Sequence, residues 1–212
     1  MGRVSLERNR SVEKGRRKPS GAAVMSADLT IALYRAFFEE WAERGLAAVS
    51  LERVAAKAGA GKAAIYRRFS SRQDFAAAAL SDLGLTLAIP EDHGSLEADV
   101  LAFLIRLRTV LRHPVIRRIV PDLHAEAARS AEMRALNAQV AEARRGQGQV
   151  LLDRAISRGE LDSSLDRDLA LDLLPAPLYW RMVVLGQTPT RRQLDVEAAA
   201  ITAGLLALVD RR

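Results

Sequence analysis

Apolar residues recur every three or four positions along most of the chain, which is the spacing of one face of an α-helix. In the first such stretch the recurring residues are Leu29, Leu33, Ala36, Phe37 and Trp41. Ser26 precedes this stretch as a candidate N-cap, and Gly45 closes it. The pattern therefore predicts a first helix over about residues 27 to 44.

Three shorter helical segments follow. A second helix is predicted between Ser50, its N-cap, and Gly59, which breaks it. Only Gly59-Ala60-Gly61 separates this helix from a third, over about residues 62 to 69. The apolar residues expected to face inward from these two helices are Leu51, Val54, Ala55, Ala58, Ile65 and Phe69. The run Ser70, Ser71, Gln73 and Asp74 has the pattern of a capping box and predicts the start of a fourth helix.

Beyond Pro90 the predicted helices become longer. An apolar stripe from Leu96 to Leu111 stops at His113-Pro114, because a residue before proline is biased away from the helical conformation. Further helices are predicted over about residues 115 to 129, 131 to 158, 166 to 185 and 190 to 210. We expect an interruption at Pro121, a weakened helix at Gly146 and Gly148, and a kink at Pro175.

Composition agrees with an all-α fold and excludes several kinds of site. Aromatic residues make up only 5% of the chain, and Ala, Leu, Arg and Glu dominate it. The chain has no Cys, and its three His are scattered, so the sequence implies no metal site and no cofactor. No apolar run approaches the roughly 20 residues that span a bilayer, and the N-terminus is charged, so we expect a soluble cytoplasmic protein.

Positive charge is concentrated in the first third of the chain. Residues 1 to 72 hold 15 Lys and Arg against 7 Asp and Glu, a net charge of +8, which leaves −2 for the remainder of the +6 total. Residues 1 to about 25 are basic and lack apolar periodicity, which predicts a disordered tail. A basic module beside a nearly neutral body favours a polyanionic partner bound at one end.

The tight connection between the second and third helices is that of a helix-turn-helix, whose third helix can lie in the major groove of DNA. Ile65 and Phe69 would face the core with Val54 and Trp41. Ala63 and Ala64 would permit close approach to base edges, and the backbone amides at Ser50 could bind a phosphate. The candidate DNA contacts are Ser50, Lys62, Ala63, Ala64, Tyr66, Arg67, Arg68 and Arg72.

These stretches resemble the TetR family, whose N-terminal module contains motifs like "aerG", "IAerAGV", "skgtlYrhF" and "sKeaL". The matching residues are Phe38-Glu39-Glu40-Trp41-Ala42-Glu43-Arg44-Gly45, Val54-Ala55-Ala56-Lys57-Ala58-Gly59-Ala60, Ile65-Tyr66-Arg67-Arg68-Phe69 and Ser71-Arg72-Gln73-Asp74-Phe75. Ala60-Gly61 and Ala63-Ala64 depart from the family pattern at positions that bear on base preference. Later, Arg158-Gly159-Glu160-Leu161 and Leu178-Tyr179-Trp180-Arg181 resemble stretches of the family's regulatory domain, although Pro175-Ala176-Pro177 replaces its usual Gly-Pro.

The resemblance implies an all-α DNA-binding regulator, most simply a homodimeric repressor that reads palindromic double-stranded DNA and is released by a small-molecule effector. We place the basic tail at residues 1–25, the helix-turn-helix domain at 26–75, and an effector-binding and dimerisation domain at 76–212. One alternative is a DNA-binding dimer without an effector. A P-loop nucleotide hydrolase is a remote alternative, because that motif needs Gly at Ala56 and Ser or Thr at Ala63.

Two further sites are predicted in the larger domain. The apolar residues Phe103, Leu104 and Leu107, with Trp180 near the proline kink, would line a pocket for a lipophilic effector. The last two helices are too apolar for one inward stripe, and small residues on the last one allow close packing of another helix, so we expect them to form the dimer interface. The interface residues expected are Leu178, Met182, Ala199, Ala203, Leu205 and Leu206.

Overall fold

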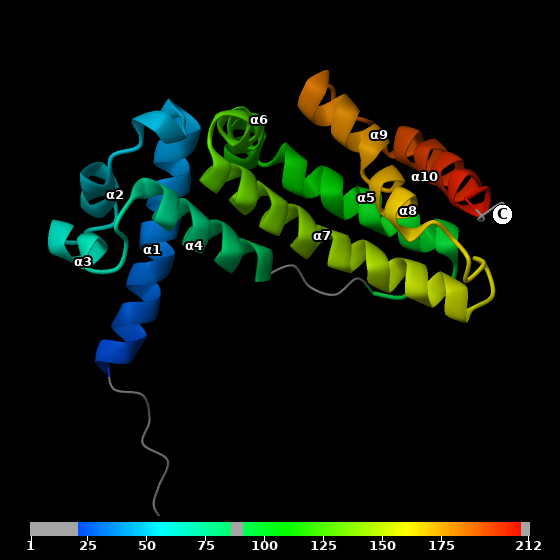
Figure 1. Cartoon of the computed structure of the whole chain (residues 1–212), viewed down its shortest axis with the longest axis horizontal. Helices are drawn as coiled ribbons and strands as arrows, with labels where there is room; N and C mark the ends of the chain where they lie inside the picture. Colours follow the sequence, from blue (N-terminus) through cyan, green and yellow to red (C-terminus); the bar gives the residue numbers. More distant parts are fainter. Residues whose placement is uncertain (1–20, 86–90, 209–212) are drawn as a thin grey trace, which may run out of the picture.

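A computed structural model describes residues 21–85 and 91–208, which form helices and no β-strand. In chain order the elements are α1 (Gly21–Arg44), η1 (Leu46–Ala48), α2 (Leu51–Lys57), α3 (Lys62–Tyr66), α4 (Arg72–Leu85), α5 (Leu96–Arg112), α6 (Pro114–Arg129), α7 (Ala131–Ser157), α8 (Arg167–Leu173), α9 (Ala176–Tyr179), η2 (Trp180–Val184) and α10 (Arg191–Leu206). Helices α1 to α4 gather at one end of an elongated molecule, and α5 to α10 build the rest (Figure 1). No helix among the described residues is long and apolar enough to cross a membrane.

Side chains cap the helices at several of the positions that the sequence suggested. Ser50 Oγ accepts a hydrogen bond from the backbone N–H of Arg53 at 3.3 Å, and Ser71 Oγ accepts one from Asp74 N–H at 3.0 Å. At the start of α10, Thr190 and Gln193 cap one another reciprocally. These caps satisfy N–H groups that the first turn of a helix leaves without partners, so the predicted helix starts at Ser50 and Ser71 are confirmed.

Three predicted boundaries are corrected. The predicted tail at 1–25 lies mostly outside the described residues, but α1 begins at Gly21, so residues 21–25 are helical. Helix α6 continues through Pro121, which is exposed, so the carbonyl that loses its backbone partner can be hydrated. The single helix predicted over 166 to 185 is three segments: α8 ends at Leu173, Pro175 becomes the N-cap of α9, and a π-helical turn, η2, follows.

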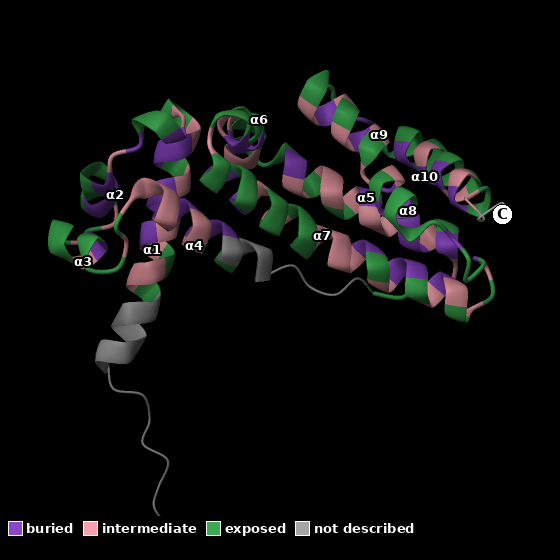
Figure 2. Ribbon diagram, in the orientation of Figure 1, coloured by how far each residue is buried: buried purple, intermediate pink, exposed green. Residues whose placement is uncertain are grey.

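Two apolar cores hold the molecule together. The predicted domain boundary between residues 75 and 76 does not separate them, because the first core contains residues from both sides of it. The first core contains the helix-turn-helix residues, with Phe37, Trp41 and Phe75 at its centre, and also takes side chains from α6 and α7 such as Leu123. The second core joins α5, α7, α8, α9 and α10. The buried segments in Figure 2 follow the inner faces of these helices. The DNA-binding end is therefore packed onto the rest through α4, α6 and α7.

Glycine on α7 and α10 lets α8 pack closely between them. A Cβ atom at Gly148 would lie 2.6 Å from Leu171 Cδ2, and one at Gly204 would lie 2.9 Å from Leu173 Cδ2. The helix expected to be weakened at Gly146 and Gly148 is unbroken over Ala131–Ser157, because the close packing at Gly148 offsets the low helix propensity.

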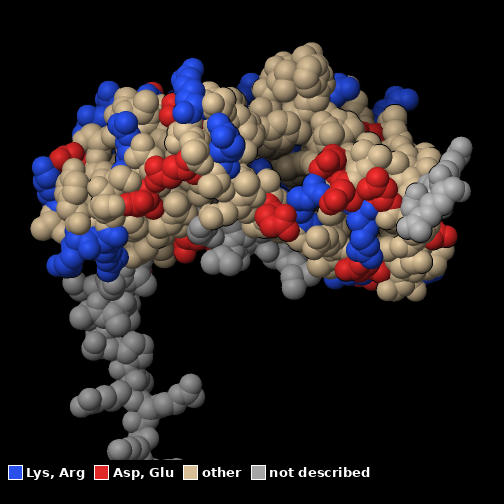
Figure 3. Space-filling view, in the orientation of Figure 1, with Lys and Arg blue, Asp and Glu red and all other residues tan. Residues whose placement is uncertain are grey.

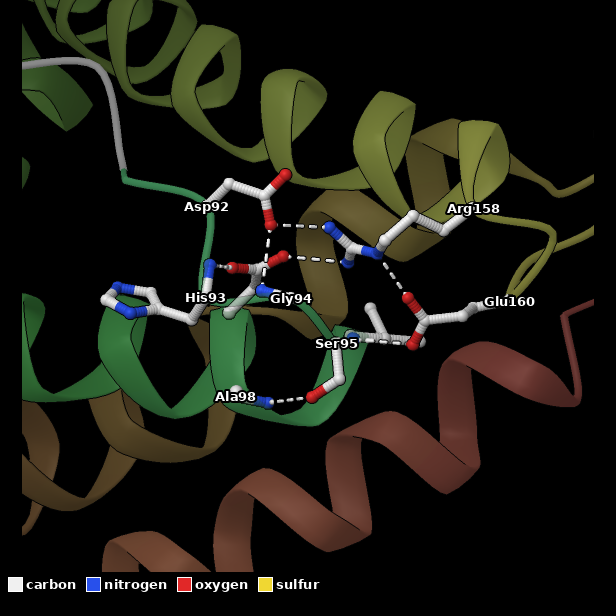
Figure 4. A network of polar contacts seen from close by, with 9 residues as sticks. Asp92, His93, Gly94, Ser95, Ala98, Arg158 and Glu160 are labelled. Carbon is white, nitrogen blue, oxygen red and sulfur yellow. Dashed lines mark hydrogen bonds and ion pairs between the residues drawn. The ribbon is translucent and has the colours of Figure 1, made fainter.

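A charged network fastens the start of α5 to the end of α7 (Figure 4). The guanidinium of Arg158 pairs with Asp92 at 2.8 Å and with the buried Asp99 at 2.8 Å, and it also contacts Glu160. Glu160 in turn accepts the backbone N–H of Leu96 at 2.6 Å, which caps the first turn of α5. The hydrogen bond from Leu96 and that from Arg158 hold the pKa of Glu160 below its usual value.

Candidate DNA-binding surface

The connection between α2 and α3 is a Schellman turn that requires glycine at one position. Gly59 has φ +67°, its N–H donates to the Ala56 carbonyl at 3.2 Å, and the N–H of Ala60 donates to the Ala55 carbonyl at 2.8 Å. A residue with a side chain would be strained at Gly59, whereas Gly61, the N-cap of α3, lies in extended backbone. The turn therefore ends α2 sharply and starts α3 after only a few residues.

Helix α3 has one buried and one exposed face. Ile65 is fully buried in the first core beside Val54, and Phe69 packs on Phe75 with a ring-centroid distance of 4.4 Å. The predicted inward orientation of Ile65 is thus confirmed. On the other side the residues that stay exposed are Lys62, Ala63, Tyr66, Arg67 and Arg68, while Ala64 is half-buried. The exposed face combines a small residue with cations and an aromatic hydroxyl, which is suited to DNA.

A buried carboxylate holds α2 in place against α1. Glu40 is only 1% exposed, and it pairs with Arg53 at 2.5 Å, Arg44 at 3.3 Å and Lys57 at 3.5 Å. Burial acts to raise the pKa of Glu40, but the hydrogen bond and charge of Arg53, with the charges of Lys57 and Arg44, bring it below its usual value. Because Arg53 and Lys57 belong to α2, this cluster fixes the position of α2 and, through the turn, of α3.

Basic side chains gather at the end of the molecule that carries α2 and α3 (Figure 3). Arg67 is exposed, and no hydrogen bond or ion pair joins it to another described residue. Arg68 donates to the Thr30 hydroxyl of α1 at 3.1 Å, and Arg72 donates to the Ala47 carbonyl. Of the predicted phosphate ligands, Arg67 is therefore the one most available, while Arg68 and Arg72 also tie α3 and α4 to neighbouring segments.

Two family models match this chain over the segments just described. Residues 33–79 match the model described as bacterial regulatory proteins of the tetR family, and residues 90–201 match that of the tetracyclin repressor-like C-terminal domain. The chain belongs to the TetR family of transcriptional regulators. It is a sequence-specific DNA-binding regulator, and the predicted fold and family are confirmed.

Relatives and solved structures agree with this assignment. The chain is 30% identical over 151 residues, 70% of its length and 73% of the relative, to an uncharacterized HTH-type transcriptional regulator, Rv1556, of Mycobacterium tuberculosis. Salmonella enterica GusR has a similar fold, with a TM-score of 0.68 at 18% identity over 85% of this chain and 95% of GusR. FadR of Bacillus subtilis, solved in complex with stearoyl-CoA, has a TM-score of 0.64 at 15% identity, over 84% of this chain and 98% of FadR.

One carboxylate that the sequence analysis did not single out connects α2 and α3 in this TetR regulator. Glu52 Oε1 pairs with Lys62 at 2.8 Å and accepts the Tyr66 hydroxyl at 2.8 Å, and Oε2 accepts the Ser50 hydroxyl at 3.0 Å. The hydrogen bonds from Lys62 and Tyr66 lower the pKa of Glu52 to about 2, so it is ionised at neutral pH. Two predicted DNA contacts are thus held by an acidic partner in the free protein.

A second missed residue, Asp122 of α6, connects the DNA-binding end of the TetR regulator to its larger domain. Its Oδ2 accepts the indole N–H of Trp41 at 2.6 Å and the backbone N–H of Leu46 at 2.9 Å. Gly45, at φ +76°, turns the chain beside this carboxylate. No spacing in the sequence could reveal this contact, because 81 residues separate Trp41 from Asp122.

The predicted apolar pocket stays a prediction, and its four residues differ in burial. Leu104 is fully buried in the second core and Phe103 and Leu107 pack partly buried on it, but Trp180 is 57% exposed. Trp180 stands two residues from the buried Leu178 and two from the buried Met182, so it points to the opposite side of the segment. One cavity of about 320 Å³ is lined by Leu111, Arg112, Arg117, Met182 and Thr188. A more open groove of about 380 Å³ lies between α10 and the segment from α9 to η2, and none of the four predicted residues lines either.

The predicted dimer interface is corrected in part. Leu178, Met182 and Leu205 are buried within the monomer and belong to the second core, which leaves little of their surface for a partner. Ala199, Ala203 and Leu206 are exposed, and for them the interface stays a prediction. We give the name outer apolar face to the larger exposed apolar residues on η2, its C-cap and α10: Trp180, Val184, Leu185, Val196 and Leu206.

Proposed function

We propose that this regulator binds a palindromic operator as a homodimer and represses transcription until a small molecule occupies its C-terminal domain. Membership of the TetR family supports the proposal. The observation that carries the DNA-binding part is the Gly59 turn, which presents the exposed face of α3 away from its buried side. We place this activity on chromosomal DNA in the cytoplasm.

In the proposed complex α3 enters the major groove with its N-terminal turn toward the bases. Ala63 and Ala64 would allow the helix backbone to approach base edges, and a methyl group could contact a thymine methyl. The proposed phosphate ligands are Lys62, Tyr66, Arg67, Arg68 and Arg72, with the backbone amides beside Ser50. The tail over residues 1–25, which lies largely outside the described residues, would add phosphate or minor-groove contacts.

The DNA contacts are tested by salt dependence. Once footprinting of bound genomic sites has identified the operator, binding of Arg67→Ala is measured at several salt concentrations. Loss of one phosphate contact should reduce the slope of log K against log salt by about 0.9. Arg129→Ala removes an exposed charge from α6, far along the chain from α3, and should leave the slope unchanged. An unaltered slope for Arg67→Ala would exclude that residue as a phosphate ligand.

The outer apolar face is the proposed dimer interface. Val196 is 66% exposed and Trp180 is 57% exposed in the monomer. Clusters of large exposed apolar residues mark interaction sites, since a partner usually covers them. Two such faces related by a two-fold axis would form a four-helix interface and would set two copies of α3 against two half-sites. In sedimentation, Leu206→Glu should yield folded monomers, whereas Ile31→Glu, at a similarly exposed position on α1, should remain dimeric.

The effector part of the proposal rests on the C-terminal domain. That FadR, a protein of similar fold, was solved with stearoyl-CoA supports small-molecule binding by a protein of this fold. The test is a screen of small molecules for release of operator DNA. If no compound in a broad screen releases the operator, the chain would instead regulate through DNA binding and dimerisation alone.

A further inference from the structure

The inward stripe of α7 changes from apolar to polar in the middle of the helix. Its members, at steps of three or four residues, are Met133, Leu136, Val140, Arg144, Gln147 and Leu151. The first three pack in or against the first core, and Leu151 belongs to the second. Arg144 and Gln147 therefore stand at core positions between the two cores. Polar residues at such positions need a partner, because their burial otherwise costs free energy.

Within the described residues Arg144 has no such partner. It is half-buried, and no described carboxylate pairs with it and no described oxygen accepts a hydrogen bond from it. Its neighbour Arg145 shows the contrast, because it pairs with Asp168 at 2.7 Å and Asp172 at 2.5 Å on α8. Burial lowers the pKa of Arg144, yet an arginine stays charged at neutral pH. One turn further on, the side-chain nitrogen of Gln147 is buried without an acceptor.

Two side chains from other helices complete this group. His124 of α6 and Tyr179 of α9 are in hydrogen-bond contact, with ring centroids 5.9 Å apart. Partial burial, then the positive charge of Arg144, lowers the pKa of His124, so its ring is neutral at pH 7. The pKa of Tyr179 is raised by burial, against the charge of Arg144, so its hydroxyl keeps its proton. Helix α6, which carries His124, packs against α7, and the charge of Arg144 acts on both rings, so the three side chains share one region of the fold.

The surface is open where these helices meet. Figure 3 shows the visible face hollowed near the middle of the molecule, between the DNA-binding end and the part built by α8 and α9. In Figure 1, α6 lies by the start of α7, and α9 lies on the same side of α7, beyond α5. His124 is exposed, and Arg144, Gln147 and Tyr179 are half-buried, so solvent and a small molecule can reach the four side chains.

We propose that Arg144, Gln147, His124 and Tyr179 form a binding site for the carboxylate of an organic anion. The guanidinium supplies a planar pair of donors that matches a carboxylate, Gln147 adds an N–H, and the tyrosine or neutral imidazole adds a third donor. A single uncompensated positive charge matches one negative charge. We call these four residues the inter-core site. The inference rests on the proposed function in one respect: it makes the organic carboxylate the effector.

The test compares carboxylates with their neutral amides. Straight-chain carboxylates from acetate to decanoate, and benzoate, are each titrated against the matching amide on the full chain, with thermal unfolding and calorimetry as readouts. Some carboxylate in this series should bind at least about 10-fold more tightly than its amide, as expected for a charge-assisted hydrogen bond. Arg144→Met should abolish the preference. Arg134→Met removes an exposed charge from the same helix and should preserve it.

A second readout separates a binding role from a structural one. Since Arg144 is an uncompensated half-buried cation, Arg144→Met should raise the melting temperature of the free protein, by about 2 to 4 °C. A structural role predicts a fall. In NMR titrations the bound carboxylate should raise the pKa of His124, because it opposes the charge of Arg144. Equal binding of every carboxylate and its amide, or a lower melting temperature for Arg144→Met, would overturn the inter-core site.

Operator release distinguishes this inference from the proposed function. If a carboxylate binds through Arg144 but the operator stays bound, the site stands and its effector role fails. If some other small molecule releases the operator equally from the wild-type protein and from Arg144→Met, the proposed function stands and the inter-core site is wrong as the effector site.

Discussion

Replacing Asp122 by alanine should loosen the DNA-binding end from the rest of the molecule. The carboxylate accepts two hydrogen bonds, from the indole of Trp41 and from the backbone of Leu46, and both residues are buried. These are the side-chain hydrogen bonds that join α6 to α1 and η1 among the described residues. In Asp122→Ala both donors lose their acceptor while apolar packing around them remains.

The cost follows from those two donors. A buried donor left unsatisfied costs about 1–3 kcal/mol, so the two together should cost about 2 to 4 kcal/mol, since water can reach the half-buried position of Asp122. Asp122→Asn keeps an acceptor oxygen in place and should cost less than half of this. Operator affinity should also fall, because the position of α1 and α3 relative to the second subunit becomes less defined.

Tryptophan fluorescence provides the assay. The chain has two Trp, so Trp180→Phe leaves Trp41 as the single reporter beside Asp122. Urea unfolding of Asp122→Ala in this background should show the loss of stability as a lower midpoint. Asp195→Ala removes an exposed carboxylate that pairs with Arg191 at 3.0 Å, and should cost under about 0.5 kcal/mol. If the two variants unfolded at the same urea concentration, the role given to Asp122 would be refuted.

Three more outcomes are expected. Arg158→Met leaves the buried Asp99 without its cation and should cost about 2 to 3 kcal/mol in urea unfolding; a loss below 1 kcal/mol would contradict this. Glu52→Gln removes the negative charge beside Lys62, so operator binding should tighten and its salt slope should steepen by about 0.9; weaker binding would show that Glu52 mainly positions α3. Burial raises the pKa of Glu197 in the monomer. Pairing with an arginine of a second copy would favour the ionised carboxylate and release the proton. Dimer affinity should therefore rise as the pH rises through the pKa of Glu197, and fall as the pH falls. Sedimentation between pH 8 and 5 checks this, and Glu197→Gln should remove the dependence.

The sequence predicted the DNA-binding end better than the larger domain, for a physical reason. The turn at Gly59 and the inward face at Ile65 depend on local spacing and on backbone conformation, which neighbouring residues determine. Trp180 was assigned to a pocket because it is an aromatic residue near Pro175, but in the folded chain it is exposed. Periodicity identifies an apolar residue without saying whether its own chain or a second copy covers it, which is why Leu205 was assigned to the interface.

Contacts between separate segments of the chain could not be predicted from the sequence. Glu52 and Asp122 are ordinary charged residues in helices, and in the sequence each is indistinguishable from a residue of a solvated face. Arg144 continues the inward stripe of α7, but the sequence does not show which side chains surround it. Their roles depend on the segments that lie next to them. Glu52 contacts α3, Asp122 contacts α1, and Arg144 lies on α7 between the two cores. Only the packing of the whole chain determines those neighbours.

The π-helical turn η2 has a consequence for which copies can assemble. A π turn holds one residue more than an α turn, so positions four and five residues apart point in nearly the same direction. This brings both Val184 and Leu185 to the side of Trp180, and all three are exposed. If the same residues had α spacing instead, Leu185, five residues after Trp180, would turn away from the shared surface. The π-helical turn therefore contributes to pairing specificity. A related regulator with α spacing there would present a differently shaped surface and would pair poorly with this chain.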